Sequence, residues 1–355
     1  MNKENLGYPG EISEFIKENN LSGFEIARVT QEHRERYVVS DGENEYEAEI
    51  TGNLRFSANS REDFPAVGDW VAIQMYDTNQ AIIHRVLPRK SVLERQAVGK
   101  SGEKQIIASN IDGAFIMQSV DNNFSVNRLE RYLTVCHSAN IEPVLIISKI
   151  DLADEARLTE VIDEIKARNK KVDYLLLSNI TTQGIEQIIS YMQKNKTYCV
   201  LGSSGVGKST LINNLLKKNV LETREISVST SKGKHTTTHR ELFILENGAI
   251  VIDTPGMREL GVTENEEGVS TTFEEIVQLS LKCKFSDCRH VDEAGCAVIE
   301  ALEKGNIDRA SFENYLKITR EQQRFQLSIA EKRKKDREFG KMAKSIMQEK
   351  KKNKY

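Results

Sequence analysis

The stretch Gly202-Ser203-Ser204-Gly205-Val206-Gly207-Lys208-Ser209-Thr210 decides the fold of this chain. It matches the pattern G-x-x-x-x-G-K-S, whose glycines let backbone N–H groups surround a polyphosphate. In that pattern Lys208 reaches the β and γ phosphates, and the Ser209 hydroxyl binds Mg²⁺. The apolar run 198–201 precedes the stretch and apolar residues at helical spacing follow it, which is the strand–loop–helix setting of a phosphate site. All nine residues are therefore predicted to bind a nucleotide.

A second motif, Asp253-Thr254-Pro255-Gly256, follows the apolar run 249–252. An aspartate at such a strand end can hold Mg²⁺ through water, and the Gly256 amide can meet the γ-phosphate. Between the two motifs lies the polar stretch Gly233-Lys234-His235-Thr236-Thr237-Thr238, where a GTPase carries its first switch. One of its threonines can close the Mg²⁺ shell, and we assign Thr237 to this role.

The choice of base rests on Ser148-Lys149-Ile150-Asp151, which precedes the phosphate loop in the chain. The Asp151 carboxylate can accept two hydrogen bonds from guanine N1 and N2, a donor pair that adenine lacks. The Lys149 stem can cover the ring, and Ser178-Asn179 after the next strand can supply amides to the base. The alternative interpretation of the tetrapeptide is a charged turn after a strand, which leaves ATP open as the nucleotide.

A cluster of possible metal ligands lies near the C-terminus. Cys283, Cys288, His290 and Cys296 form C-x4-C-x-H-x5-C and include three of the five cysteines. Three thiolates and an imidazole make a closed tetrahedral set, which predicts one structural Zn²⁺. The alternatives are reduced thiols with a chance histidine, or Asp287 and Cys199 as weaker substitute ligands. A helix is expected to start at Thr272, capped with the help of Glu275 three residues later.

The overall composition is that of a chain that can bury hydrophobic cores. It has 355 residues, of which 39% are hydrophobic and 29% charged, enough for two or three domains. No run has the length of a membrane span, and residues 1–6 lack the apolar core of a signal peptide. Cysteine usage does not suggest a secreted disulfide scaffold. We therefore expect a cytoplasmic protein with no membrane partner.

Charge is concentrated at one end. The net charge is −3, but residues 331–355 contain eleven Lys and Arg against four Asp and Glu. Such a tail is either a solvated, partly disordered segment or a contact for a polyanion.

Two regions with different periodicities precede the cysteine cluster. Residues 24–87 contain five short β-rich runs separated by turns, at 24–29, 36–39, 46–50, 70–73 and 81–86, which predict an oligonucleotide-binding (OB) type β-barrel. The alternative is a small β-domain that merely packs. After Pro88, apolar strands at 114–117, 144–147, 174–177 and 198–201 alternate with helical stripes, which predict an α/β domain with a parallel sheet. The stripe that holds Leu129, Tyr132, Leu133 and Cys136 is predicted to be core.

The order of the motifs is rearranged: base motif, base-side loop, phosphate loop, first switch, second switch. With a barrel before it and a Cys/His cluster after it, this order resembles the bacterial circularly permuted ribosome-assembly GTPases, the ribosome small-subunit-dependent GTPase A family. The resemblance runs from about Phe24 to Tyr315. The motifs that carry it are GSSGVGKST at Gly202, GKHTTT at Gly233, DTPG at Asp253 and CKFSDCRH at Cys283.

The resemblance implies a GTP hydrolase of weak intrinsic activity that is stimulated by the small ribosomal subunit during its late maturation. Its partners would be that subunit with its rRNA, together with GTP or GDP. Its cofactors would be Mg²⁺ and one Zn²⁺. The protein would be a monomer. The rival function is a nucleotide-dependent rRNA-binding scaffold in which hydrolysis is incidental. Expected domains are an N-terminal extension (1–23), the barrel (24–90), a circularly permuted GTPase domain (91–265), a helical zinc-binding module (266–325) and a basic tail (326–355).

Three positions depart from the pattern of that family or of GTPases at large. Ser148 stands where the base motif usually begins with Asn or Thr, and Asn179 stands where the base-side loop usually has Ala. Met257 follows Gly256 where many GTPases have a water-orienting glutamine, and a thioether cannot do that work. The resemblance implies that His235 positions or activates the water instead. The alternative is a solvated switch histidine.

Overall fold

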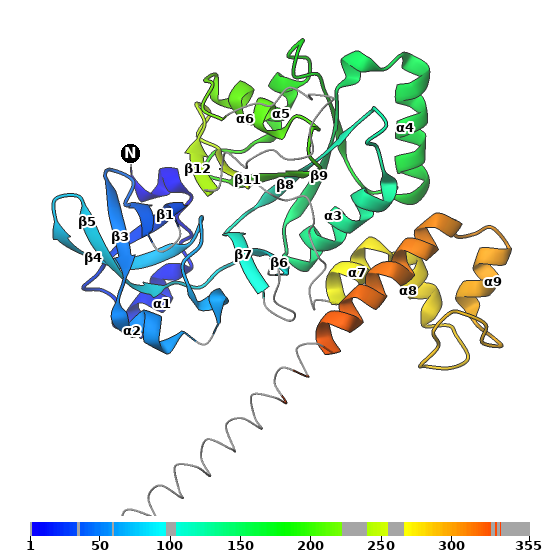
Figure 1. The fold of residues 1–355 in the computed structure, drawn as a ribbon, viewed down its shortest axis with the longest axis horizontal. Helices are drawn as coiled ribbons and strands as arrows, with labels where there is room; N and C mark the ends of the chain where they lie inside the picture. Colours follow the sequence, from blue (N-terminus) through cyan, green and yellow to red (C-terminus); the bar gives the residue numbers. More distant parts are fainter. Residues whose placement is uncertain are drawn as a thin grey trace, which may run out of the picture.

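The structure, a computed structural model, describes residues 2–33, 36–58, 60–96, 104–221, 240–254, 266–327, 331 and 334. It has three parts. An N-terminal β-barrel and a C-terminal helical module lie on opposite sides of a central α/β domain (Figure 1). Within the described residues, no helix combines the length and the apolar character that a membrane crossing requires.

The barrel is closed and has the five strands that the sequence predicts. They are β1 (Glu25–His33), β2 (Arg36–Ser40), β3 (Glu45–Ile50), β4 (Trp70–Asp77) and β5 (Gln80–Val86). They pair in the order β1-β2-β3-β5-β4, and β4 returns to pair with β1; only β3 and β5 run parallel. Alternate residues of these strands face inward and fill the barrel with small and β-branched side chains. The OB-type prediction is confirmed.

Short helices and loops flank the barrel. They are η1 (Lys3–Leu6), α1 (Ile12–Glu18), α2 (Gly52–Ser57) and η2 (Arg61–Asp63). Leu6, Ile12 and Leu21 pack against Trp70 on the outer face of β4, so the first residues of the chain cover a side of the barrel that would otherwise expose apolar surface.

The central domain is built on a mostly parallel sheet. Its strands are β8 (Gly113–Ser119), β9 (Glu142–Ser148), β10 (Tyr174–Leu177), β11 (Thr197–Gly202), β12 (Arg240–Ile244) and β13 (Ile250–Asp253). They lie in the order β10-β9-β8-β11-β13-β12, and all neighbours are parallel except β13 and β12. The hairpin β6 (Val92–Gln96) and β7 (Lys104–Ser109) leads into this sheet.

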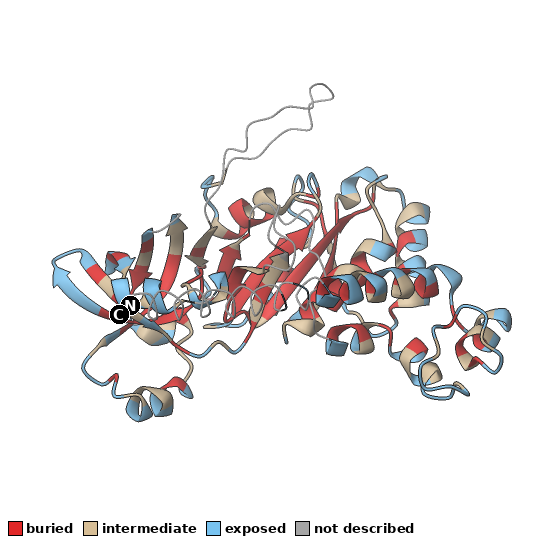
Figure 2. Cartoon of the chain, turned by 60° about the horizontal axis from the view of Figure 1, so that its bottom comes forward, coloured by how far each residue is buried: buried red, intermediate tan, exposed pale blue. Residues whose placement is uncertain are grey.

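Helices cover both faces of the sheet, which is why its strands are apolar on both sides (Figure 2). Helices α3 (Val126–Ser138), η3 (Ile150–Leu152) and α4 (Glu155–Arg168) lie toward one face, and α5 (Ile185–Tyr191) and α6 (Lys208–Leu216) cover the other. Ile116 of β8 faces the α3 side, and its neighbour Met117 faces the α6 side. The predicted core stripe of α3, Cys136 included, is fully buried.

The barrel and the central domain share one sheet. Strand β12 pairs antiparallel with β1 of the barrel, so the eleven strands form a continuous sheet. The pairing places Glu32 beside Arg240, whose guanidinium donates to its carboxylate at 2.6 Å, and Gln31 donates to Glu241 at 2.8 Å.

The C-terminal module packs on α3 of the central domain. It consists of α7 (Glu266–Thr272), α8 (Glu274–Ser280), α9 (Ala297–Glu303) and a helical segment at 309–327, around its own apolar core. A side chain at Gly268 of α7 would collide with the Thr134 carbonyl and the Ser138 hydroxyl of α3, so the two helices touch closely. The buried Glu130 of α3 accepts hydrogen bonds from Ser311 at 2.9 Å and Asn314 at 2.7 Å.

The predicted helix start at Thr272 is wrong. Thr272 is the last residue of α7, and its hydroxyl donates to the Gly268 carbonyl one turn earlier. The same hydroxyl lies 3.0 Å from Nδ1 of His137 on α3. The next helix, α8, begins after Phe273 without a side-chain cap, because the phenyl group of Phe273 has no acceptor; it packs in the core of the module instead. Packing has therefore overridden the local capping signal.

One buried arginine joins the barrel to the central domain. The side chain of Arg28, which is 1% exposed, donates to the carbonyls of Leu6, Gly68 and Asn110 and to the Thr197 hydroxyl. Burial lowers the pKa of its guanidinium to about 10, although Asp112 and Asp69 oppose that shift. Thr197 begins β11, the strand that leads to the phosphate loop. The barrel is thus fixed to the base of the nucleotide-site strand.

We predict that Arg28→Met lowers the free energy of unfolding by about 3 kcal/mol, because four buried acceptors lose their donor. Chemical denaturation measures this change. The matched control is Arg85→Met, which removes an exposed arginine of the same barrel whose guanidinium lies 5.2 Å from the Phe15 ring; it should cost less than about 1 kcal/mol. Equal effects of the two substitutions would show that Arg28 does not join the domains.

Candidate nucleotide and metal sites

The predicted phosphate loop lies at the switch point of the sheet, where the helices that follow two neighbouring strands pack on opposite faces. Strands β8 and β11 are neighbours, but α3 follows β8 onto one face and α6 follows β11 onto the other. Ligands of open α/β sheets bind in the crevice outside the carboxyl ends of such strands. Gly207 has a φ of +99°, and a Cβ there would lie 2.6 Å from the Asn179 amide nitrogen. Only glycine fits this backbone conformation and this approach.

On the phosphate side, Lys208 and Asp253 face each other. Lys208 Nζ donates to the carbonyls of Gly202 and Ser203, both at 2.7 Å, so the ammonium lies over the loop. Asp253 ends β13, the other neighbour of β11. Burial raises the pKa of Asp253 to about 6, while the nearby Lys208 acts in the opposite direction. A cation beside Asp253 would favour its ionised form.

On the base side, short hydrogen bonds tie the tetrapeptide 148–151 to its neighbours. The buried Ser148 hydroxyl donates to the Val206 carbonyl of the phosphate loop at 2.8 Å. Ser178 donates to an Asp151 carboxylate oxygen at 2.5 Å, which orients a carboxylate that is otherwise exposed to solvent. Although Ser148 is shorter than an asparagine, it therefore still joins the base motif to the phosphate loop.

The base-side loop is held on α6. The Asn179 side-chain amide donates to the Gly207 carbonyl at 3.0 Å, and Asn214 of α6 donates to the backbone and side-chain oxygens of Asn179, both at 3.2 Å. Asn179, the second departure from the family pattern, thus makes contacts that an alanine could not.

The structure therefore brings the described sequence-predicted residues together at the carboxyl-end edge of the parallel sheet. A chain of contacts runs from Asp151 through Ser178, Asn179 and Gly207 to Lys208, whose charge acts on Asp253. His235, Thr237 and Gly256, with Met257, lie outside the described residues. Three residues that contact the site were not predicted: Asn214, Asp121 and Asn123. The last two lie in the loop after β8, and the position of this loop at a strand's carboxyl end is the signal that could have identified them.

The four predicted metal ligands form a compact cluster. The sulfur atoms of Cys283, Cys288 and Cys296 and a ring nitrogen of His290 all lie within 4.8 Å of one another. Sγ of Cys283 is 3.9 Å from Sγ of Cys296, and Nδ1 of His290 is 3.7 Å and 3.3 Å from these two atoms. A tetrahedron with Zn–S bonds of about 2.3 Å has S···S edges of about 3.8 Å. The donor set therefore fits a tetrahedral metal ion.

The two substitute ligands do not join this cluster. Cys199 lies fully buried within β11, and Asp287 is not among the four grouped ligands, although it lines a surface hollow together with Cys288.

Comparisons with known proteins agree with this architecture. A model of the RsgA GTPase family matches residues 86–263. The chain belongs to this family. A relative named "Small ribosomal subunit biogenesis GTPase RsgA 1" from Bacteroides thetaiotaomicron is 37% identical over 350 residues, which cover 98% of each chain. The RsgA GTPases hydrolyse GTP, so the chain is a GTPase by family.

Two solved structures resemble the fold. YjeQ from Thermotoga maritima is 29% identical and superimposes with a TM-score of 0.62 over 83% of this chain and 96% of that one. YloQ, described as a circularly permuted GTPase, is 24% identical, with a TM-score of 0.60 over 87% and 96%. The fold of this RsgA family member is thus a circularly permuted GTPase domain between a barrel and a module with a Cys₃His cluster.

We predict that the protein contains one divalent metal ion per chain and that Cys296→Ser removes it, because a hydroxyl replaces a thiolate ligand. Atomic emission spectroscopy measures the metal content. Asp287→Asn, beside the cluster, should retain the metal and serves as the control. A strong chelator should lower the unfolding temperature of the wild-type protein but leave Cys296→Ser unchanged. Metal-free wild-type protein that unfolds at an unchanged temperature would contradict a structural role.

Proposed function

We propose that this chain is a GTP hydrolase of weak intrinsic activity that the small ribosomal subunit stimulates during late maturation of that subunit. The observation that carries the proposal is that Asp151, Lys208 and Asp253, which come from three distant segments, follow or end parallel strands at the same edge of one sheet. The name of the Bacteroides relative supports the ribosomal part, since that relative is described as acting in small-subunit biogenesis and matches nearly the whole chain.

Each nucleotide-site residue has a proposed role. Asp151 accepts hydrogen bonds from guanine, while Lys149 and the amides of 178–179 contact the base. Backbone N–H groups of the loop and the Lys208 ammonium bind the phosphates. The residues proposed to bind GTP are Ser148, Lys149, Ile150, Asp151, Ser178, Asn179, Gly202, Ser203, Ser204, Gly205, Val206, Gly207, Lys208, Ser209, Thr210, Asp253 and Gly256.

Two metal ions belong to this proposal. Ser209 and Thr237 would hold the Mg²⁺ that accompanies GTP, with Asp253 acting through water, and the ion would offset negative charge on the β and γ phosphates. Zn²⁺ occupies the Cys₃His cluster and stabilises the module. Because all four ligands come from protein, this zinc offers no open position for catalysis.

Hydrolysis requires a group that orients the attacking water. Met257 cannot serve. The resemblance to the family implies that His235 in the first switch takes this role once the partner particle orders the loop, and we propose the same here. The dependence on a partner follows from this assignment, since a catalytic group that is placed only in the complex gives slow hydrolysis in its absence.

Both switches lead directly into the flanking domains. The first switch is followed by β12, which is paired with β1 of the barrel. The segment after Asp253 is followed by α7, which packs on α3 and begins the C-terminal module. Contacts of the two switches with the γ-phosphate can therefore bias the positions of both flanking domains. A large partner that binds these domains would then distinguish the GTP-bound from the GDP-bound state.

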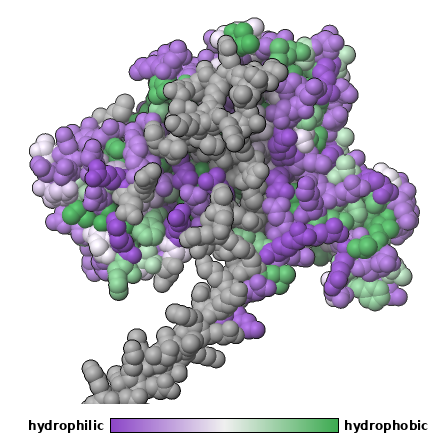
Figure 3. All heavy atoms as spheres, viewed as in Figure 1, coloured by the Kyte–Doolittle hydropathy of each residue, from purple (hydrophilic) through white to green (hydrophobic). Residues whose placement is uncertain are grey.

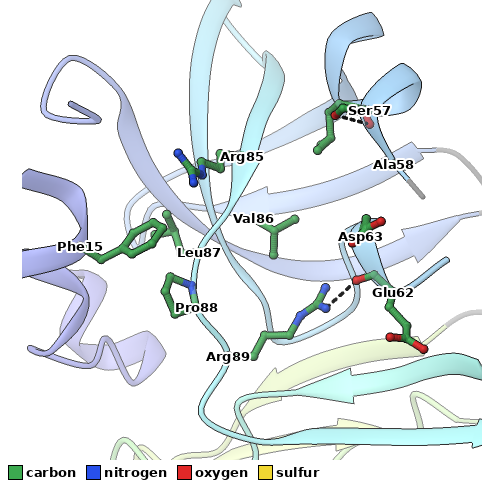
Figure 4. Close-up of a pocket in the computed structure, with 11 residues that line it drawn as sticks. Phe15, Ser57, Ala58, Glu62, Asp63, Arg85, Val86, Leu87, Pro88 and Arg89 are labelled. Carbon is green, nitrogen blue, oxygen red and sulfur yellow. Dashed lines mark hydrogen bonds between the residues drawn. The ribbon is translucent and has the colours of Figure 1, made fainter. Parts of the chain in front are cut away.

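The partner surface is proposed to contact rRNA through the barrel, the module and the basic tail. On the barrel, Phe56 of α2 is 94% exposed. A hollow of about 490 Å³ beside α2 is lined by Phe15 and the exposed Arg85, which lie together in Figure 4. An exposed aromatic ring such as Phe56, and an exposed cation such as Arg85 over the half-buried Phe15, suit stacking on unpaired bases and contact with phosphates. The face in Figure 3 is otherwise largely hydrophilic where it is described.

The remaining assignments follow from this function. We propose that the chain divides into five parts, which span residues 1–23, 24–90, 91–265, 266–325 and 326–355. We also propose that the protein acts in the cytoplasm, where ribosomal subunits mature. A monomer is proposed because this one chain supplies the described parts of both sites; a dimer in sedimentation velocity would contradict this.

Single-turnover hydrolysis of GTP, with and without small ribosomal subunits, tests the function. We expect the subunits to raise the rate at least about tenfold, because they order the catalytic switch. Large subunits are the control and should have no effect. His235→Ala should abolish most of the rise while GTP affinity stays unchanged. Pelleting of the same mixtures with a non-hydrolysable GTP analogue or GDP should show stronger binding to small subunits with the analogue.

Two outcomes would change the conclusion. Nucleotide-dependent binding to small subunits without any stimulation of hydrolysis would favour the scaffold function. Full stimulation of His235→Ala would remove this histidine from the mechanism.

We predict that Asp151→Asn weakens GTP binding about 10- to 100-fold and improves binding of xanthosine triphosphate, whose O2 can accept from the new amide. Competition against a fluorescent nucleotide measures both affinities, with ATP included as a competitor. Asp163→Asn, an exposed change on α4, is the matched control and should leave both affinities unchanged. Retained preference for GTP in Asp151→Asn would contradict the role of Asp151.

A further inference from the structure

We propose that two residues of the loop between β8 and α3 (residues 120–125) belong to the nucleotide site: Asp121 positions Lys149, and Asn123 positions the phosphate loop. This inference rests on the proposed GTPase function and deepens it. The loop contains no nucleotide motif, so its role is visible only in the structure.

The topology places this loop at the nucleotide crevice. Strands β8 and β11 are adjacent and parallel, with Met117 of β8 opposite Gly202, the first residue of the phosphate loop. Helix α3 leaves β8 toward one face and α6 leaves β11 toward the other. The crevice at such a switch point is bordered by both loops that leave these strands. The second of them is the phosphate loop, so the first borders the same ligand.

Asn123 contacts the phosphate loop directly. Its amide nitrogen donates to the Ser203 hydroxyl at 2.9 Å and to the Ser204 carbonyl at 3.3 Å. Arg128, in the first turn of α3, donates to the side-chain oxygen of Asn123 at 2.8 Å and to its backbone oxygen at 3.0 Å. A guanidinium only donates hydrogen bonds, so the Asn123 side chain must turn its oxygen toward Arg128, and its nitrogen then points at the phosphate loop. The orientation of Asn123 is therefore set by α3.

Asp121 contacts the base side of the site. One carboxylate oxygen lies 2.9 Å from Nζ of Lys149, and the other accepts from the Ser119 hydroxyl at 2.7 Å and from the backbone N–H of Asn123 at 3.0 Å. Burial disfavours ionisation of Asp121, but the hydrogen bonds from Ser119 and Lys149 outweigh it and lower its pKa. The Lys149 side chain is thus fixed at both ends, so it loses less rotamer freedom when a purine packs against its stem.

One short loop consequently contacts both the base side and the phosphate side of the proposed site. Asp121 accepts from the backbone N–H of Asn123, so the residue that contacts Lys149 is hydrogen-bonded to the residue that contacts Ser203. Between them, Asn122 is exposed and offers a control of the same residue type in the same loop.

The test compares Asn123→Ala with Asn122→Ala. Fluorescent GDP and a fluorescent non-hydrolysable GTP analogue measure dissociation constants, and thermal unfolding checks that each variant is folded. We expect Asn123→Ala to bind both nucleotides about 3- to 10-fold more weakly, since it removes hydrogen bonds that pre-order the loop. Asn122→Ala should stay within about twofold of the wild type. Equal dissociation constants for the two variants would overturn the role of Asn123.

A double-mutant cycle separates positioning from a general loss of structure. In the Asn123→Ala background, Ser203→Ala should weaken binding much less than it does in the wild type, because the shared contact is already gone. Strict additivity of the two changes would contradict the contact. The cycle remains informative even if Asn123→Ala lowers stability, since the readout is nucleotide affinity.

Asp121 is tested by steady-state kinetics. Asp121→Ala should raise KM for GTP about 3- to 10-fold and leave kcat unchanged, since Lys149 acts at the base and not at the transferred phosphate. A fall in kcat at constant KM would contradict the assignment. Should the wild-type protein bind no guanine nucleotide, the proposed function itself fails; should it bind but respond equally to changes at Asn122 and Asn123, only this inference fails.

Discussion

The central constraint in this molecule is that the carboxyl ends of parallel strands lie along one edge of a sheet. Strands β8, β9, β10, β11 and β13 all run parallel, so the segments that follow them meet at the same edge whatever their order in the chain. This is why a permuted order of motifs can still build one site. Asp151 after β9, Lys208 after β11 and Asp253 at the end of β13 lie along the same edge of the sheet and are distant in sequence.

The permutation changes what the nucleotide site is attached to. Because the chain enters the α/β domain before β8 and leaves it after β13, the barrel and the C-terminal module are connected at the two ends of a permuted GTPase domain. Buried polar contacts then fix each of them. Arg28 joins the barrel to Thr197 at the start of β11. Glu130 of α3 accepts from Ser311 of the module, and it also accepts from Arg168 at the end of α4 at 2.5 Å. A buried guanidinium or carboxylate is stable only with its partners in place, so both contacts specify one arrangement.

Helix α3 connects two functions in this arrangement. Its first turn carries Arg128, which orients Asn123 against the phosphate loop, and its following turns carry Glu130 and Arg131, which contact the module. Arg131 binds Glu321 with two hydrogen bonds of 2.8 and 2.7 Å. The helix therefore contacts Asn123 of the proposed phosphate site and the module that carries the Cys₃His cluster.

Local patterns in the sequence determined the strands, the core stripes, the phosphate-loop motif and the Cys₃His set, because period, glycine placement and ligand spacing act over a few residues. Tertiary structure alone decided the contacts of residues with ordinary local surroundings. Thr272 looks like a helix cap, yet it ends a helix, because the packing of Phe273 and the contact with His137 place the boundary elsewhere. Asp121 and Asn123 look like a polar turn, and they contact Lys149 and the phosphate loop only because β8 lies between β9 and β11. Ser148 looks like a weakened base motif, but its hydroxyl reaches Val206, a contact that depends on β9 and β11 ending at the same edge of the sheet and that no spacing along the chain encodes.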